Sequence, residues 1–142
     1  MQGFKYFFTV VDDFSHYTWV IMLRNKFEVR SHIINFTHYV ETQFHKKIKF
    51  IHTDNGAEFN MHVFFVSKGI THQTTCIETP QQNGIVERKH QHLLNVTRAL
   101  LFQANLPSLF WEFVVKHVAF LINCTPTLII SNLAPHEKLY GT

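Results

Sequence analysis

Residues 47–56 read KIKFIHTDNG, a short apolar run that stops abruptly at polar turn residues. The run Lys47 to His52 has the length and composition of a buried strand. Asp54 follows it directly, and open α/β sheets bind their ligands beside the carboxyl ends of strands. Asp54 is therefore a candidate ligand-binding carboxylate. Because Asp-Asn-Gly is also strong turn chemistry, an Asx-type turn is the alternative explanation for the same residue.

Strand and helix patterns alternate on both sides of this segment. Aromatic and β-branched residues predict strands at Phe4 to Val11, Tyr17 to Leu23 and Ile70 to Cys76. Apolar residues at helical spacing predict helices at Val29 to Phe44, Ile85 to Gln103 and Pro107 to Asn123, with a short one at Phe59 to Val66. This order of elements predicts an α/β fold with a mixed sheet.

Composition limits the class of protein. The 142 residues, 46% hydrophobic and 16% charged, suit one globular domain over residues 1–142. A net charge of +3 is a mild basic bias, which permits nucleic acid as a partner without requiring it. The most apolar stretch, Leu109 to Ile122, is too short to span a bilayer and includes charged side chains. We therefore expect no membrane partner.

A second carboxylate stands at the start of a predicted helix. Residues 79–90 read TPQQNGIVERKH, in which a flexible polar neck, residues 81–84, leads into the helix, and Glu87 lies in or just past its first turn. Helix-end electrostatics, worth roughly 0.3–1 kcal/mol, is one explanation for an acid there. The other is that Asp54 and Glu87 converge at one end of the sheet. Two such carboxylates suit hard divalent cations, which support phosphoryl transfer in pairs.

Several motifs, taken together, resemble one family. HTDNGAEF (52–59), ETPQQNGIVERKHQHLLNVTRALL (78–101) and APHEKLYG (134–141) resemble the integrase core of copia-type LTR retrotransposons. KYFFTVVDDFSHYTWV (5–20) and LPSLFWEFVVKHVAFLINCTP (106–126) match the same family's surrounding segments. The resemblance implies a ribonuclease-H-like mixed sheet flanked by helices and a DDE transposase mechanism. In that mechanism, water hydrolyses a phosphodiester bond near each end of the element's DNA, and the freed 3′-hydroxyl attacks target DNA. If this role holds, the protein acts in the nucleus.

The resemblance assigns roles residue by residue. It makes Asp54 and Glu87 the family's second and third catalytic acids and ligands of Mg²⁺ or Mn²⁺. It implies DNA as the partner, with self-association open and no small-molecule substrate. The predicted nucleic-acid contacts are the neck residues and basic residues of the Glu87 helix: Gln81, Gln82, Asn83, Arg88, Lys89 and Arg98. For the earlier lysines Lys46, Lys47 and Lys49, a solvated charged face is an equally good explanation.

The chain also departs from the family pattern. The family's first catalytic Asp lies on a central strand upstream of the segment matched from Gly3. We therefore expect these 142 residues to lack that strand and to be inactive by themselves; Asp12 and Asp13 are not substitutes. We expect the two flanking strands, Phe4 to Val11 and Lys47 to His52, to close up and pair directly. The alternative is that their edges stay open and recruit another chain. The alternative function is a non-catalytic module for nucleic-acid binding, or for dimerisation through the Leu106 to Phe120 helix.

Overall fold

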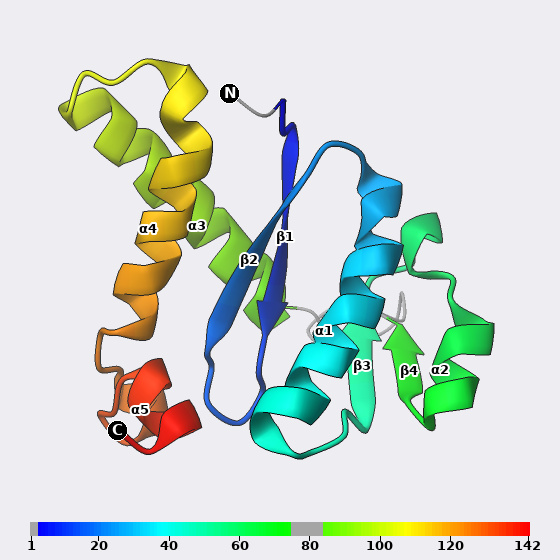
Figure 1. The fold of residues 1–142 in the computed structure, drawn as a ribbon. Helices are drawn as coiled ribbons and strands as arrows, with labels where there is room; N and C mark the ends of the chain where they lie inside the picture. Colours follow the sequence, from blue (N-terminus) through cyan, green and yellow to red (C-terminus); the bar gives the residue numbers. More distant parts are fainter. Residues whose placement is uncertain (1–2, 75–83) are drawn as a thin grey trace. The chain divides into compact units, whose positions relative to one another are not determined.

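The computed structural model describes residues 3–74 and 84–142 (Figure 1). The chain divides into two compact units. The first unit comprises Met1–Met22 and Val86–Thr142, and the second comprises Leu23–Ile85. The two units are described separately below, because the positions of the chain's parts relative to one another are not determined.

In the first unit, strands β1 (Tyr6–Val11) and β2 (Thr18–Leu23) form a two-stranded sheet. The turn between them is built around Asp12, whose Oδ2 accepts hydrogen bonds from the backbone N–H and the hydroxyl of Ser15, at 2.9 and 2.6 Å. Asp12 therefore has a structural role in this turn.

Three helices complete the first unit: α3 (Gly84–Gln103), α4 (Trp111–Asn123) and α5 (Pro135–Tyr140). Their core is an apolar cluster contributed by β1, β2, α3 and α4: Phe7, Met22, Leu93, Val115, Val118 and Ala119. Asn123 ties the end of α4 to β2, because its amide exchanges two hydrogen bonds with the Thr18 backbone, at 2.9 and 2.8 Å.

The second unit contains α1 (Val29–Phe44), β3 (Phe50–Thr53), α2 (His62–Lys68) and β4 (Thr71–Thr74). β3 and β4 pair in parallel, with Phe50 opposite Thr71 and Thr53 opposite Thr74. Parallel strands need a crossover connection, which α2 supplies. α2 ends at Gly69, whose φ of 69° lies in the left-handed region that favours glycine.

The predicted elements are present, but their pairing differs from the expectation. The third strand begins at Phe50 rather than Lys47, and a 3-10 turn, Ala57–Phe59, precedes α2. The direct pairing expected between the first and third strands is wrong. In the described ranges the strands form two separate sheets, β1–β2 and β3–β4. Each strand pairs with its nearest neighbour in sequence, and such short connections cost the least loop-closure entropy.

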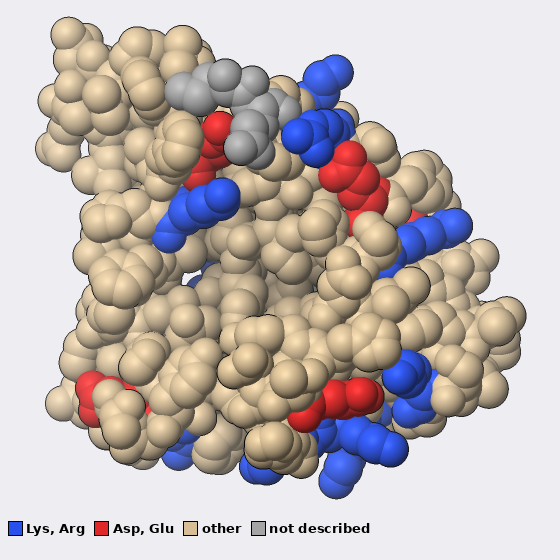
Figure 2. All heavy atoms as spheres, viewed as in Figure 1, with Lys and Arg blue, Asp and Glu red and all other residues tan. Residues whose placement is uncertain are grey.

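The charged side chains are dispersed. Figure 2 shows both Lys and Arg side chains (blue) and Asp and Glu side chains (red) at several separate places on one face. This agrees with the small excess of 13 basic over 10 acidic residues. Within residues 3–74 and 84–142, no helix combines the length and apolar character that a membrane crossing needs.

Candidate metal and nucleic-acid site

Asp54 lies in the second unit, immediately after β3. The Gly56 backbone N–H donates to Asp54 Oδ1 at 2.8 Å, which confirms the predicted Asx-type turn. The Asp54 side chain is nevertheless exposed. Because an ionised carboxylate offers about four lone-pair positions, this one hydrogen bond leaves acceptor capacity for a cation. The turn and the ligand interpretations of Asp54 are therefore compatible.

Two further side chains, those of Thr53 and Arg30, fix the backbone around Asp54. The Thr53 hydroxyl donates to the Asp54 carbonyl at 2.8 Å and lies 2.7 Å from Nε2 of His72 on β4. On the other side of the turn, the Arg30 guanidinium of α1 donates to the Ala57 and Glu58 carbonyls, at 3.0 and 3.3 Å. The chain therefore enters and leaves the Asp54 turn through anchored residues.

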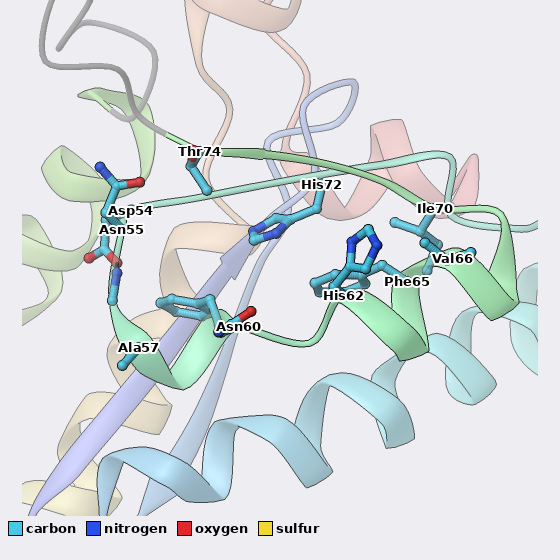
Figure 3. A pocket seen from close by; sticks show the side chains of 12 residues that line it. Asp54, Asn55, Ala57, Asn60, His62, Phe65, Val66, Ile70, His72 and Thr74 are labelled. Atoms are coloured by element: carbon cyan, nitrogen blue, oxygen red, sulfur yellow. Dashed lines mark hydrogen bonds between the residues drawn. The ribbon is translucent and has the colours of Figure 1, made fainter.

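An open pocket of about 480 Å³ adjoins Asp54 within the second unit. Figure 3 shows Asp54 and Asn55 at one end and His62, Phe65 and Val66 toward the other, with His72 between them. The Phe65 ring lies 4.7 Å from the His72 ring. The rings of Phe65 on α2 and His72 on β4 thus give the pocket an aromatic side, whereas the end formed by the Asp54 turn is polar.

The two histidines of this sheet differ in their partners. Burial, and then the nearby His52, lower the pKa of His72, which favours its neutral form. His72 is hydrogen-bonded to Thr53, whereas the buried Nε2 of His52 has no hydrogen-bond partner among the described residues. Neither histidine was a predicted site residue.

Glu87 lies in the first unit, in the first turn of α3, as the sequence predicted. Its side chain is exposed, and it has no hydrogen bond or ion pair with any residue that the structure describes. An exposed carboxylate at the positive end of a helix is stabilised by the helix dipole. Its oxygens remain available as hard ligands for a divalent cation.

His90 lies one turn further along α3, and sequence reasoning missed it. Its Nδ1 is 2.8 Å from the Thr9 hydroxyl on β1, and its ring stacks on Phe7 with centroids 4.2 Å apart and planes 18° apart. Burial lowers the pKa of His90. Because 81 positions separate Thr9 from His90, no local sequence pattern signals this contact.

The candidate nucleic-acid residues do not share one face. Counting roughly 100° per residue along a helix, Arg98 lies about 20° from Glu87, whereas Arg88 lies about 100° away. Both arginines are exposed. Lys89 is partly buried, and this burial lowers the pKa of Lys89. The predicted contacts Gln81, Gln82 and Asn83 lie outside the described residues, so their role stays a prediction.

The donor chemistry of the acidic pair fits Mg²⁺ or Mn²⁺, since both groups are exposed carboxylates. Among residues 3–74 and 84–142, no three His, Cys, Asp or Glu side chains gather into a metal-binding group. Asp54 belongs to the second unit and Glu87 to the first. The expectation that they share a cation therefore stays a prediction.

Solved structures similar to this chain define its class. A chain of the simian T-cell lymphotropic virus intasome, in complex with PP2A regulatory subunit B56 gamma, matches with a TM-score of 0.71 and 20% identity, covering 93% of this chain and 47% of that one. The HTLV-2 integrase catalytic core domain in complex with magnesium, in its trimeric form, matches with a TM-score of 0.66 and 22% identity, covering 93% and 82%. The fold is therefore ribonuclease-H-like.

The family follows from sequence relatives. The pattern of the integrase core domain family matches residues 1–80, more than half of the chain, which therefore belongs to this family. The retrovirus-related Pol polyprotein from transposon RE1 of Arabidopsis thaliana is 35% identical over 142 residues, and that from transposon TNT 1-94 of Nicotiana tabacum is 37% identical over 140. These alignments cover 99% and 96% of this chain but 10% of each polyprotein. The resemblance inferred from the motifs is confirmed.

Proposed function

We propose that this chain is the core of a retrotransposon integrase, which acts on DNA by metal-dependent phosphoryl transfer. The observation that carries the proposal is the match to the integrase core family over residues 1–80, which include Asp54. The motif resemblance adds Glu87, and both carboxylates are exposed. These two residues would hold Mg²⁺ or Mn²⁺. When bound, the cations would activate the attacking hydroxyl and stabilise the leaving oxygen.

The chain's own groups would position the carboxylates and the DNA. The Gly56 N–H orients one Asp54 oxygen, and α3 presents Glu87 from its first turn. The exposed side chains of Arg88 and Arg98 would contact backbone phosphates, which are present at every nucleotide. Such contacts locate the duplex without selecting a sequence, so recognition of particular DNA ends would depend on other contacts.

For the 142-residue chain alone, we propose DNA binding without strand joining. The resemblance assigns Asp54 and Glu87 to two of the family's three acids. Two carboxylates can bind one cation weakly, whereas the paired-cation mechanism also needs a ligand that bridges the two metal positions. The proposed strand joining would therefore need a third acid in addition to Asp54 and Glu87.

Metal titration tests the acidic pair. We expect Mn²⁺ binding by the purified chain to weaken at least about tenfold in Asp54→Asn and in Glu87→Gln, because each removes a ligand charge. The exposed Asp13 provides a matched control, and Asp13→Asn should bind Mn²⁺ like the wild type. Equal affinity in all four proteins would refute the metal site. Mn²⁺-dependent joining of DNA ends by the wild type, abolished by Glu87→Gln, would instead refute inactivity of the isolated chain.

Self-association is a second candidate function. Helix α4 exposes Phe113 and Phe120 to 57% and 61%, and Leu121 to 45%. Exposed apolar side chains grouped on one helix are typical of protein–protein contacts. The similar HTLV-2 integrase core domain is described in dimeric and trimeric forms. Analytical ultracentrifugation of the wild type and of Phe120→Ser tests this function, and a concentration-independent monomer in the wild type would exclude it.

A further inference from the structure

Each candidate carboxylate is accompanied by the same set of three side chains. A threonine hydroxyl is hydrogen-bonded to a histidine ring nitrogen, and a phenylalanine packs against that histidine ring. We refer to these sets as Thr–His–Phe triads. The triad of the second unit consists of Thr53, His72 and Phe65, and that of the first unit consists of Thr9, His90 and Phe7. Neither triad includes a candidate metal ligand.

In the second unit, the hydrogen bonds determine which nitrogen of His72 carries a proton. The buried Thr53 hydroxyl has one hydrogen and donates it to the Asp54 carbonyl at 2.8 Å. His72 Nε2, 2.7 Å from the same oxygen, must therefore be the donor in the second bond. Phe65, only 2% exposed, supports the ring from one side. His72 thus orients the hydroxyl that fixes the carbonyl of Asp54.

In the first unit, the triad anchors the beginning of α3. The buried residues of this helix, Leu93 and Thr97, both lie further along it. His90, stacked on Phe7 and bonded to Thr9, is tied to β1 closer to the helix start. Because residues three apart on a helix lie on the same side, this tie restricts rotation of the turn that carries Glu87.

We propose that His72 and His90 are positioning residues, which hold Asp54 and Glu87 in fixed directions through Thr53 and through the first turns of α3. This inference rests on the proposed metal-binding function of the two carboxylates. In this role neither imidazole would be a ligand of the cation. Burial lowers the pKa of both histidines, and an uncharged ring near a cation site adds no repulsion. Residues that orient metal ligands commonly determine affinity without touching the metal.

The test removes each threonine hydroxyl while keeping the side-chain shape. Thr53→Val and Thr9→Val break the two triads, whereas Thr53→Ser and Thr9→Ser retain the hydroxyl and should restore the wild-type behaviour. Thr97→Val is the matched control, because Thr97 is buried on α3 and its hydroxyl has no partner among the described residues. If a valine variant does not fold, His72→Phe or His90→Phe keeps a ring while removing the hydrogen bond.

The first measurement needs no metal. We expect amide hydrogen exchange to accelerate about three- to tenfold, the factor for one lost hydrogen bond. In Thr53→Val the acceleration should be confined to the Gly56 amide, which reports the direction of the Asp54 carboxylate. In Thr9→Val it should be confined to the bonded amides around the first turn of α3, residues 88–91. Exchange at the wild-type rate in both valine variants would overturn the proposal.

The second measurement is Mn²⁺ affinity. We expect each valine variant to bind about tenfold more weakly, the loss typical when a ligand-orienting residue is removed. The serine variants and Thr97→Val should bind like the wild type. Wild-type affinity in both valine variants would overturn the positioning role. If the wild type binds no Mn²⁺, the proposed function fails, and the exchange measurement alone then decides whether the triads position the two carboxylates.

Discussion

At the scale of single residues, the hydroxyl groups of three threonines differ in what they contribute. Thr53 and Thr9 each share a hydrogen bond with a histidine, whereas the buried Thr97 hydroxyl has no partner among the described residues. An unsatisfied buried hydroxyl loses its hydration without compensation, so it destabilises the folded state. Residues of the same type, all similarly buried, therefore have opposite expected effects on stability.

We predict that Thr97→Val raises the free energy of unfolding by about 1 kcal/mol, because valine has the same shape and no hydroxyl to desolvate. Urea unfolding measures this change. Thr37→Val is the comparison, since the buried Thr37 hydroxyl donates to the Ile33 carbonyl at 2.9 Å. The Thr37 substitution should lower the free energy of unfolding. A loss of similar size in both variants would contradict the prediction.

The histidines predict how stability depends on pH. The folded-state pKa values of His72 and His90 are lowered, chiefly by burial, and His52 adds to the effect at His72. Unfolded histidine has a pKa of about 6.5, so below that pH the unfolded chain binds more protons than the folded one. The free energy of unfolding should therefore fall as the pH drops below about 6.5 and through the lowered folded-state values.

Urea unfolding at several pH values between about 8 and 5 measures this slope, since this range spans the pKa of unfolded histidine. His72→Phe and His90→Phe each remove one group, so each should flatten the slope relative to the wild type. His62→Gln, at an exposed position in the second unit, serves as the control substitution. Slopes equal to that of the wild type in both phenylalanine variants would contradict the assignment.

At the scale of elements, the β3–α2–β4 motif explains how a four-residue strand can present Asp54. The parallel pairing of β3 and β4 supports the strand end, and the crossover helix α2 buries Phe65 beneath the pair. Gly69 allows the chain to leave α2 and enter β4 directly. A change at Gly69 therefore acts on the whole connection.

We predict that Gly69→Ala destabilises the protein by about 1 kcal/mol, because the φ of 69° is unfavourable for a residue with a Cβ. The added Cβ would meet no described heavy atom within 4 Å, so the cost is conformational rather than steric. Gly69→Asn is the matched variant, since asparagine tolerates the left-handed conformation better. Thermal unfolding should rank glycine above asparagine above alanine, and alanine equal to glycine would contradict the explanation.

At the scale of the whole molecule, the chain has a small basic excess. It has 13 lysines and arginines against 10 acidic residues. Binding to DNA through a few phosphate contacts is weak at physiological salt and depends steeply on salt concentration. We therefore expect this chain to bind DNA with little sequence preference.

We predict that Arg88→Ala and Arg98→Ala each weaken duplex DNA binding and reduce the slope of log K against log salt by about 0.9, the value for one phosphate contact. Fluorescence anisotropy across a salt series measures both effects. Lys116 on α4 is an exposed control in the same unit, and Lys116→Ala should change neither quantity. An unchanged slope in both arginine variants would remove α3 from the DNA interface.

The local features of this chain could be read from its sequence. The strands and helices follow from composition and periodicity, the Asp54 turn follows from Asp-Asn-Gly, and the family follows from motifs in order along the chain. Each of these depends on residues close in sequence, where backbone preferences act directly. The strand boundaries were less accurate, because the third strand begins at Phe50, where pairing with β4 begins.

Only the tertiary structure decided which strands pair and which side chains support the carboxylates. The sheet closure expected between the first and third strands did not occur, since β1 pairs with β2 and β3 with β4. The triads were equally unpredictable, because the contact between Thr9 and His90 joins residues 81 positions apart. Such contacts leave no periodic trace in a sequence. They form only when packing brings distant segments together and burial makes an unpaired hydroxyl or imidazole costly.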